Sequence, residues 1–360
     1  MEYILLICIL PLLWAVISKF VFPRKISVKE MLIQCAVTFI VVASGYYLSK
    51  ANLISATEIL NGQITAKNSE RVSCEHSYEC HCHRVYDTDS GGRRSSHREC
   101  DTCYEHSYDV DWNVTSTVGE FTIDRVDRQG LFAPPRWSQI ARGEPASKSI
   151  SYKNYVKGAK FSLFNFGELA NDKRFATLIP AYPQVYDYYR INRVLALGLV
   201  LPDQQSLNAL LNDQLRILGP QKQANVILVV VNTAEPSYRY ALERAWIGGE
   251  KNDIIVIIGM TEYPKIAWVD TITLAKDSGN ELLQVKMRDE LLALQTLDNP
   301  VIVTAKIASV ISTDFHRKHM KDLKYLEAEI QPSMTAMMIL YIVTVLLNVG
   351  LTWCFYNNEV

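Results

Sequence analysis

Three long apolar segments constrain this chain more than any other feature of its sequence. They run from Tyr3 to Phe22, from Met31 to Leu48 and from Met334 to Tyr356, and Lys19 is the only charged residue in them. A helix needs about 20 apolar residues to cross the hydrocarbon of a bilayer. The alternative is a helix in a protein core, but such helices rarely stay apolar on all sides for this length. We therefore predict transmembrane helices at residues 1–22, 31–50 and 334–356, which excludes an ordinary cytosolic enzyme.

The first segment reads as a retained anchor, because Glu2 replaces the usual basic start of a signal peptide and bulky residues follow the segment. The loop at residues 23–30 and the end of the segment before it are basic. Short basic loops stay in the cytoplasm. Residues 51–333 are then extracytoplasmic and the tail 357–360 is cytoplasmic. A second basic cluster, His316–His319, argues the other way, but it lies farther from its span. The basic residues of the loop and of the end of the preceding segment are Lys19, Arg24, Lys25 and Lys29.

Residues 51–170 are predicted to form a β-rich module. Apolar and polar residues alternate with period two from Asp111 to Val118 and again from Phe121 to Val126. This alternation is typical of half-buried strands, and Gly119-Glu120 between them favours a hairpin turn. Repeated Gly and Pro between Gly130 and Pro145 then predict loops.

Residues 171–333 are predicted to form an α/β unit. Continuous apolar runs at Asn225–Val231 and Asp253–Gly259 indicate strands buried on both faces, and Lys265–Val269 indicates an edge strand. Helical periodicity covers residues 203–218, where Gly219-Pro220 should end the helix, and then 237–247, 280–297 and 301–329. Helices that separate buried strands predict an α/β sandwich with parallel pairing.

Two resemblances follow from particular residues. The order Leu201-Pro-Asp-Gln, helix, strand, then Trp246-x-Gly-x₃-Asn-Asp253 before an apolar strand is similar to the TPM domain, over about residues 199–295. That likeness implies a small α/β fold held outside the membrane by an anchor; phosphatase activity or calcium binding has been suggested for some members. Segments such as Asp124–Gly130 and Pro134–Trp137 resemble uncharacterised membrane proteins of bacteriophages and bacteria.

Cysteine and histidine are concentrated in one short segment. Five of the eight cysteines lie between Cys74 and Cys103, together with most of the histidines. Two tetrapeptides in this region are identical, since Glu75-His-Ser-Tyr78 recurs as Glu105-His-Ser-Tyr108. The remaining cysteines, Cys8, Cys35 and Cys354, lie in the apolar segments, where a cysteine behaves as a small apolar residue.

The spacing Cys80-x-Cys82, then Cys100-x₂-Cys103, is close to that of a zinc ribbon, in which four thiolates surround a structural Zn²⁺. We predict zinc on these four residues, with Cys74, His76 and His106 as alternates. Disulfides are the competing interpretation, because an extracytoplasmic module is exposed to oxidation. A catalytic or redox role is a third.

Carboxylates suggest a second site, for Ca²⁺ or Mg²⁺, in the α/β unit: Glu243, Glu250, Asp253 and Asp270 lie near the ends of predicted elements. Helix caps and surface charge explain them equally well. The chain lacks a phosphate-binding loop, a nucleophile elbow and a His-Glu-x₂-His motif.

We therefore expect a membrane-anchored multidomain protein of the bacterial inner membrane, or of a phage-infected host. Its first predicted function is that of a non-enzymatic envelope binding or scaffold protein, whose partners are the bilayer and another envelope protein. The net charge of −1 argues against a nucleic-acid partner. The alternative is a metal-dependent hydrolase, similar to a phosphatase, that uses the carboxylates of the α/β unit. A pore or lysis protein is disfavoured, because the apolar segments hold few polar residues to line a channel.

Overall fold

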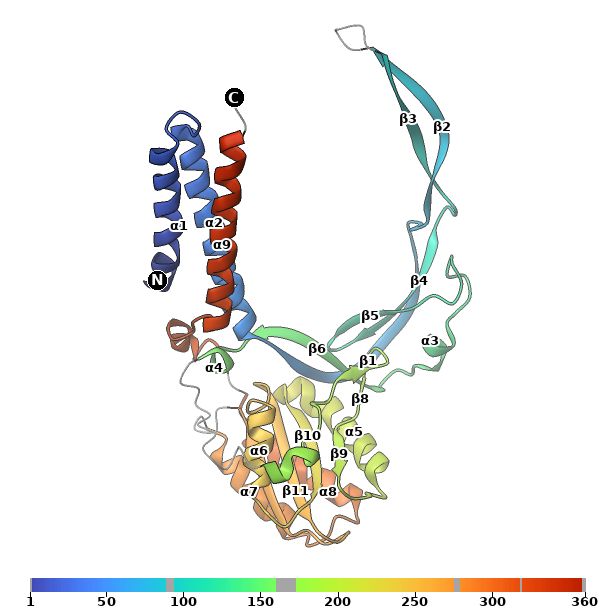
Figure 1. Ribbon diagram of the computed structural model, residues 1–360. Helices are drawn as coiled ribbons and strands as arrows, with labels where there is room; N and C mark the ends of the chain where they lie inside the picture. The colour runs from blue at the N-terminus through green and yellow to red at the C-terminus, as the bar shows by residue number, and fades with distance from the viewer. Residues whose placement is uncertain (1, 89–93, 160–172, 275–278, 318, 358–360) are drawn as a thin grey trace.

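A computed structural model describes residues 2–88, 94–159, 173–274, 279–317 and 319–357. It has three parts (Figure 1): a bundle of three helices, a long curved β layer that ends in an extended arm, and an α/β unit below both. The bundle and the arm rise from the same side of the molecule, with a wide space between them. The predicted boundary between the two extramembrane modules, at residues 170 and 171, lies outside the described residues.

The bundle consists of α1 (Glu2–Val21), α2 (Val28–Ile54) and α9 (Met334–Asn357), which pack against one another. Ser27 begins α2 with a capping box, in which its side chain and that of Glu30 each accept a backbone N–H. In length and composition α2 and α9 are suited to cross a membrane, with mean hydropathy of 1.8 and 2.1 over their most apolar windows. In α1 the stretch Leu12–Val21 is an apolar helix that is shorter than the spans of α2 and α9.

The β layer is a four-stranded antiparallel sheet of order β5-β4-β1-β6. Its longest strand, β1 (Ser55–Val72), pairs first with β6 (Pro145–Lys153) and then, beyond an irregularity at Ile64–Ala66, with β4 (Asp109–Ser116). The predicted hairpin is present as β4 and β5 (Gly119–Ile123), but its turn lies at residues 117–118 instead of 119–120. The arm is the antiparallel pair β2 (Ser77–Thr88) and β3 (Arg94–Tyr104).

The α/β unit contains a sheet of order β12-β11-β10-β9, in which β9 (Val194–Leu197), β10 (Asn225–Asn232) and β11 (Asp253–Met260) are parallel and β12 (Trp268–Thr273) is antiparallel. Both long apolar strands are buried on both faces, as predicted. One face packs on α5 (Gln204–Lys222), α7 (Glu281–Leu292) and α8 (Pro300–Asp314). The other packs on α6 (Tyr238–Ala245). Successive β10 residues alternate between these two cores, as the pleat requires.

Four element boundaries differ clearly from the predictions, the first being that the helix predicted over 280–297 ends at Leu292. Helix α5 continues through Gly219 and Pro220 and ends at Lys222, although Pro220 has no N–H to donate to the carbonyl oxygen four residues earlier. The edge strand begins at Trp268 rather than Lys265. The helix predicted over 301–329 ends at Asp314. Short elements complete the chain: α3 (Pro135–Gln139), α4 (Tyr155–Gly158), the 3₁₀ turns Lys173–Leu178 and Lys324–Ala328, and the strands β7 (Val185–Tyr186) and β8 (Arg190–Ile191).

The β layer and the α/β unit share a buried polar network. The fully buried Arg193, which precedes β9, donates to Asn61 of β1, to Ser147 of β6 and to Asn225 of β10. The Asn61 amide also donates to the carbonyl oxygen of Ala224 at 2.9 Å. Buried polar groups must be paired, and here they are paired across the two predicted modules. The two modules are therefore joined by an interface that neither could bury alone.

Candidate functional site

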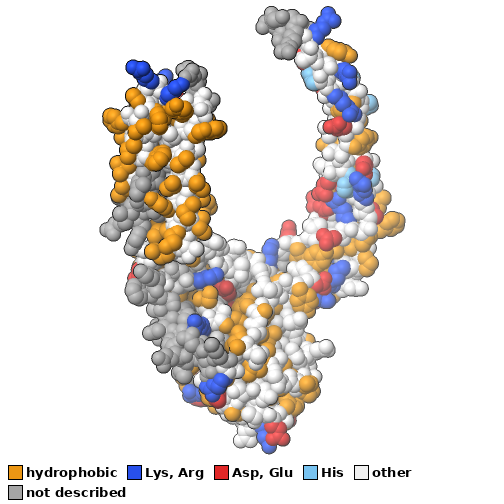
Figure 2. Space-filling view, viewed as in Figure 1, with side chains coloured by type: hydrophobic (Ala, Val, Ile, Leu, Met, Phe, Trp, Pro, Cys, Tyr) orange, Lys and Arg blue, Asp and Glu red, His pale blue; other side chains and the backbone are white. Residues whose placement is uncertain are grey.

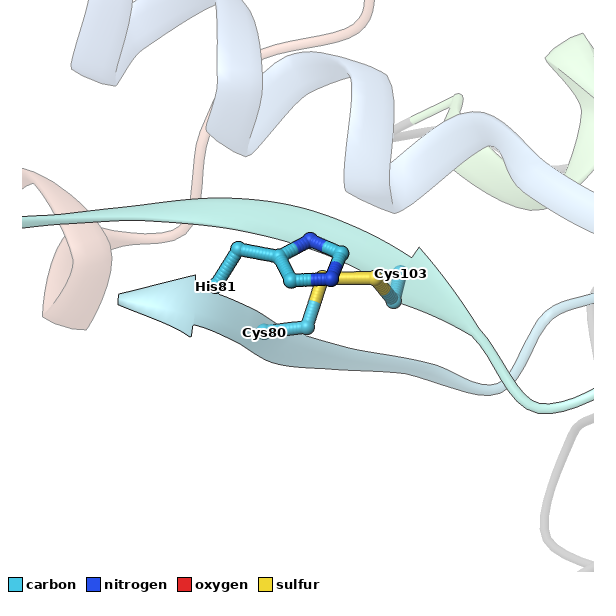
Figure 3. A group of neighbouring side chains, drawn as sticks. All are labelled: Cys80, His81 and Cys103. Carbon is cyan, nitrogen blue, oxygen red and sulfur yellow. A yellow bond between two sulfur atoms is a disulfide. The ribbon is translucent and has the colours of Figure 1, made fainter. Parts of the chain in front are cut away.

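The arm is a two-stranded ribbon with almost no apolar core. Every residue of β3 is exposed except Cys100 and Cys103, which are half-buried. Two disulfides join its strands, Cys80–Cys103 and Cys82–Cys100, and Figure 3 shows the first of them with the His81 ring beside it. A hairpin of two strands is marginally stable by itself, so these cross-links stabilise the ribbon where packing cannot.

The preferred interpretation of these four cysteines, a zinc ribbon with four thiolates, is not what the structure forms. The disulfide alternative is present, and the register explains the pairing. Between Cys80 and His83 the strand β2 has an irregularity, and His81 there has a φ of 47°. Cys82 consequently lies opposite Cys100, with 4.0 Å between their Cα atoms. All four sulfurs are bonded in disulfides, so these residues offer no set of four thiolates to a metal.

At the base of the arm, the chain passes from the sheet into the arm through residues 73–76 and returns through residues 105–109. We call these two segments the neck. The two copies of Glu-His-Ser-Tyr face each other here, and the backbone N–H of Glu105 donates to the carbonyl oxygen of His76 at 3.0 Å. The rings of His76 and His106 are nearly perpendicular, with centroids 6.1 Å apart. The alternate ligands Cys74, His76 and His106 are therefore brought together.

A buried carboxylate completes the neck. Asp109, which is 0% exposed, has one oxygen 3.3 Å from Nδ1 of His106, and that nitrogen lies 3.7 Å from Sγ of Cys74. Its second oxygen accepts the backbone N–H of Glu75 at 3.0 Å and Nη1 of Arg125 at 2.9 Å. The backbone N–H of Glu75, the Cys74 thiol and the Arg125 guanidinium hold the pKa of Asp109 below its ordinary value.

Three groups of Cys, His, Asp or Glu side chains in the described residues have donor atoms close enough to hold a metal ion. Two include disulfide cysteines: Cys80, His81 and Cys103, and then Glu79, Cys82 and Cys100. The third is Cys74, His106 and Asp109. An open pocket of about 680 Å³ adjoins the neck, and its lining includes Glu75, His76 and Asp111.

The four carboxylates of the predicted cation site fall into two separate pairs. Asp253 begins β11 and binds the backbone N–H of Glu250 at 2.8 Å. Glu243 and Asp270 both lie near Arg239, at 3.6 and 3.3 Å. Asp270 is opposite Ile257, four residues along β11 from Asp253, which is about 13 Å at the ordinary rise of a strand. The structure therefore does not assemble the four into one site.

The first of these pairs is buried and bound to protein donors. Asp253 accepts hydrogen bonds from Tyr182 at 2.9 Å and from Asn225 at 2.8 Å, and Glu250 accepts one from Tyr152 at 2.7 Å. Burial raises the pKa of Asp253 to about 6 and that of Glu250 to about 7. These carboxylates anchor loops to the sheet, whereas the alternative that the sequence offered to a cation site was helix caps and surface charge.

Sequence reasoning missed two residues that matter here. Asp109 was grouped by sequence with Asp111, Asp124 and Asp127, as a solvated sheet face or secondarily a calcium or magnesium site, and not with Cys74 and His106, although it follows the second Glu-His-Ser-Tyr repeat directly. Glu58, 1% exposed, binds Arg317 at 2.5 Å and Lys251 at 2.9 Å and so ties β1 to the segment after α8 and to the start of β11. No local pattern marks Glu58, because its partners are distant in the sequence.

Comparison with protein-family models, with curated proteins and with solved structures gives no match for this chain. The likeness to the TPM domain therefore stays a prediction.

Proposed function

We propose that this protein is an integral membrane protein of the bacterial inner membrane, or of a phage-infected host, that spans the bilayer three times. Its extracytoplasmic residues 51–333 act as a binding or scaffold module of the cell envelope, and the arm is the element that contacts another envelope protein. The proposal rests on the helix bundle, in which polar side chains are buried and large apolar side chains are exposed.

The bundle has polar side chains inside and apolar side chains outside. Gln34 is fully buried and donates to the side-chain oxygen of Asn348 at 2.9 Å, and Asn348 in turn donates to Thr38 at 3.0 Å. Large apolar residues such as Phe20, Leu48 and Leu346 are exposed by 65% or more. Figure 2 shows apolar side chains over the visible face of the bundle. This is the reverse of a soluble core and suits a bundle surrounded by lipid, where polar side chains bind across helices.

The orientation rests on two independent observations. The basic loop before α2 contacts the C-terminal end of α9, since the rings of Phe22 and Tyr356 are 5.2 Å apart and Lys25 lies over the Tyr356 ring. Both ends would thus lie on the cytoplasmic side. The disulfides of the arm belong to the opposite, oxidising side. Both features favour extracytoplasmic residues 51–333.

The arm suits a contact role because it exposes aromatic residues far from the body of the protein. Tyr78, Tyr86 and Tyr104 are exposed by 52%, 70% and 58%, and tyrosine is enriched at protein interfaces. The ribbon also carries charges such as Arg84 and Glu99. Such a surface does not enter hydrocarbon. In the membrane the arm must therefore lean away from the bilayer, toward the aqueous phase where a partner is reached.

A hydrolase has less support. Its proposed carboxylates are divided between two places, and those of Glu250 and Asp253 are bound by tyrosine, asparagine and backbone donors. An assay for phosphate-ester turnover with divalent metals tests it. Turnover that both Asp253→Asn and Asp270→Asn abolish would support the hydrolase.

The experiment that tests the binding role is site-specific photocrosslinking in native membranes. A photoreactive amino acid at Tyr86 of the full chain should give a discrete adduct with one envelope protein. The same group at Val200, 85% exposed on the α/β unit, is the matched control and should not give it. An adduct equally strong from both positions, or none from Tyr86 and the neighbouring arm tyrosines, would contradict the proposed role of the arm.

A further inference from the structure

We propose that the neck is a zinc site, with Sγ of Cys74, Nδ1 of His106 and a carboxylate oxygen of Asp109 as ligands. These three atoms come from both chain segments of the neck and lie within 4.8 Å of one another. They are distinct from the four cysteines of the arm, which are paired as disulfides. This inference does not depend on the contact role of the arm.

Two of the three separations between the donor atoms match a tetrahedral zinc ion. With zinc about 2.3 Å from sulfur and about 2.1 Å from nitrogen and oxygen, tetrahedral angles separate sulfur from nitrogen by about 3.6 Å and nitrogen from oxygen by about 3.4 Å. In the neck, Sγ of Cys74 lies 3.7 Å from Nδ1 of His106, and that nitrogen lies 3.3 Å from the Asp109 oxygen. Both separations agree with the tetrahedral values to about 0.1 Å, and the third pair, sulfur and oxygen, lies within 4.8 Å.

The Asp109 carboxylate is oriented as a ligand would be. Its Oδ1 is buried and accepts no hydrogen bond from the residues that the structure describes, and its neighbour is Nδ1 of His106 at 3.3 Å. Its Oδ2 is fixed by the backbone N–H of Glu75 and by Arg125. A buried carboxylate oxygen without a hydrogen-bonding partner is costly. A cation at this point would remove the cost, while the partners of Oδ2 hold the group in place.

The surroundings suit a divalent cation that enters from solvent. Around Asp109, the carboxylates of Glu75 and Asp111 outnumber the one guanidinium of Arg125 that pairs with all three. The adjoining pocket brings solvent to the neck, where Glu75 and His76 lie on its wall. Nε2 of His76 is 2.9 Å from the carbonyl oxygen of Arg128, so this ring is held by the backbone and is not one of the three groups that supply donor atoms.

The chain path indicates what the ion does. Cys74 precedes β2, and His106 and Asp109 follow β3, so one ion joins the two segments that carry the arm. Soft sulfur with nitrogen and oxygen suits Zn²⁺. Binding releases the Cys74 thiol proton to solvent and leaves a zinc-bound thiolate. The ion would also protect a thiol that, on the oxidising side, remains outside the two disulfides.

The test is metal binding to the full chain in detergent with its disulfides intact. The stripped protein is titrated with Zn²⁺ against a chromophoric chelator, and separately with Co²⁺, whose thiolate charge-transfer band reports a sulfur ligand. We expect one zinc per chain and a cobalt–thiolate band. Cys74→Ser should abolish the band and weaken zinc binding by more than about tenfold, since loss of even an outer-shell partner costs 10- to 100-fold. His97→Gln, in the exposed His97–Asp87 pair of the arm, is the matched control and should change neither.

Three results would overturn the proposal: no zinc in the oxidised protein, a cobalt–thiolate band that survives Cys74→Ser, or zinc that binds only after reduction. The last would assign the metal to Cys80, Cys82, Cys100 and Cys103. Should Cys74→Ser fail to fold, alkylation of the wild-type chain decides. Peptide mapping should find Cys74 protected by Zn²⁺ and reactive after chelation, and equal reactivity in both states would refute the site.

Discussion

The interface between the β layer and the α/β unit can be tested with one methyl group. Gly219 of α5 lies against β1, where an added Cβ would be 2.6 Å from the carbonyl carbon of Asn61, 2.8 Å from its Cβ and closer still to its carbonyl oxygen. Two of these atoms are backbone, so the strand or the helix must move by most of an ångström. Overpacking of this kind costs up to about 3 kcal/mol. The higher helix propensity of alanine relative to glycine stabilises the folded state by about 1 kcal/mol.

We therefore expect Gly219→Ala to lower the free energy of unfolding by about 2 kcal/mol, close to a 30-fold change in the folding equilibrium. The assay is urea unfolding of the full chain in detergent, followed by the fluorescence of tryptophans that lie on both sides of the interface. Gly350→Ala is the matched control, because its added Cβ meets no atom of the described residues within 4 Å. If Gly219→Ala were as stable as the wild type or more so, helix propensity alone would account for its stability. In that case β1 would not lie on α5 as described.

Three further predictions concern the bundle, the interface and pH. Asn348→Leu removes the hydrogen bond from Gln34 and should destabilise the bundle by about 1 kcal/mol in detergent unfolding, since interhelical bonds in lipid average about 0.6 and reach about 1.7 kcal/mol; a gain in stability would indicate an ordinary apolar core. Glu58→Ala leaves Arg317 without its buried partner and should cost about 3–5 kcal/mol in the same assay, whereas an effect below 1 kcal/mol would mean that water reaches the pair. Because the folded pKa of Glu250 is raised to about 7, the folded protein holds this proton more tightly, and the free energy of unfolding should fall as pH rises from about 4 to 7. Glu250→Gln should flatten that slope, and a pH profile unchanged by it would refute the assignment.

The parts of the fold that depend on local pattern were predictable. Runs such as Asn225–Val231 are apolar throughout because both faces of the central strands are covered, and the structure buries them as expected. The same is true of α2 and α9, whose length and composition suit a membrane. The buried polar face of α9 was also predictable, because Thr344, Asn348 and Thr352 recur every four residues and so share one helix face.

Boundaries and pairings were not predictable in this way. A Pro near the end of a helical segment is typical of a stop, yet α5 continues two residues past Pro220 to Lys222. The spacing of Cys80, Cys82, Cys100 and Cys103 fits both zinc and disulfides. One irregularity in β2, at His81, sets which cysteines lie opposite each other. Strand register is fixed by the assembled ribbon, so the spacing alone left both chemistries open.

The residues of the neck show the same division. The sequence by itself identified the cysteines and histidines and the repeated tetrapeptide, because these are properties of neighbouring positions. Only the tertiary structure brought Asp109 to His106 and Cys74, with Arg125 on its other oxygen, and only it separated Asp253 from Asp270. Periodicity records whether an element is buried, whereas the meeting of donor atoms from distant segments depends on the path that the chain takes between them.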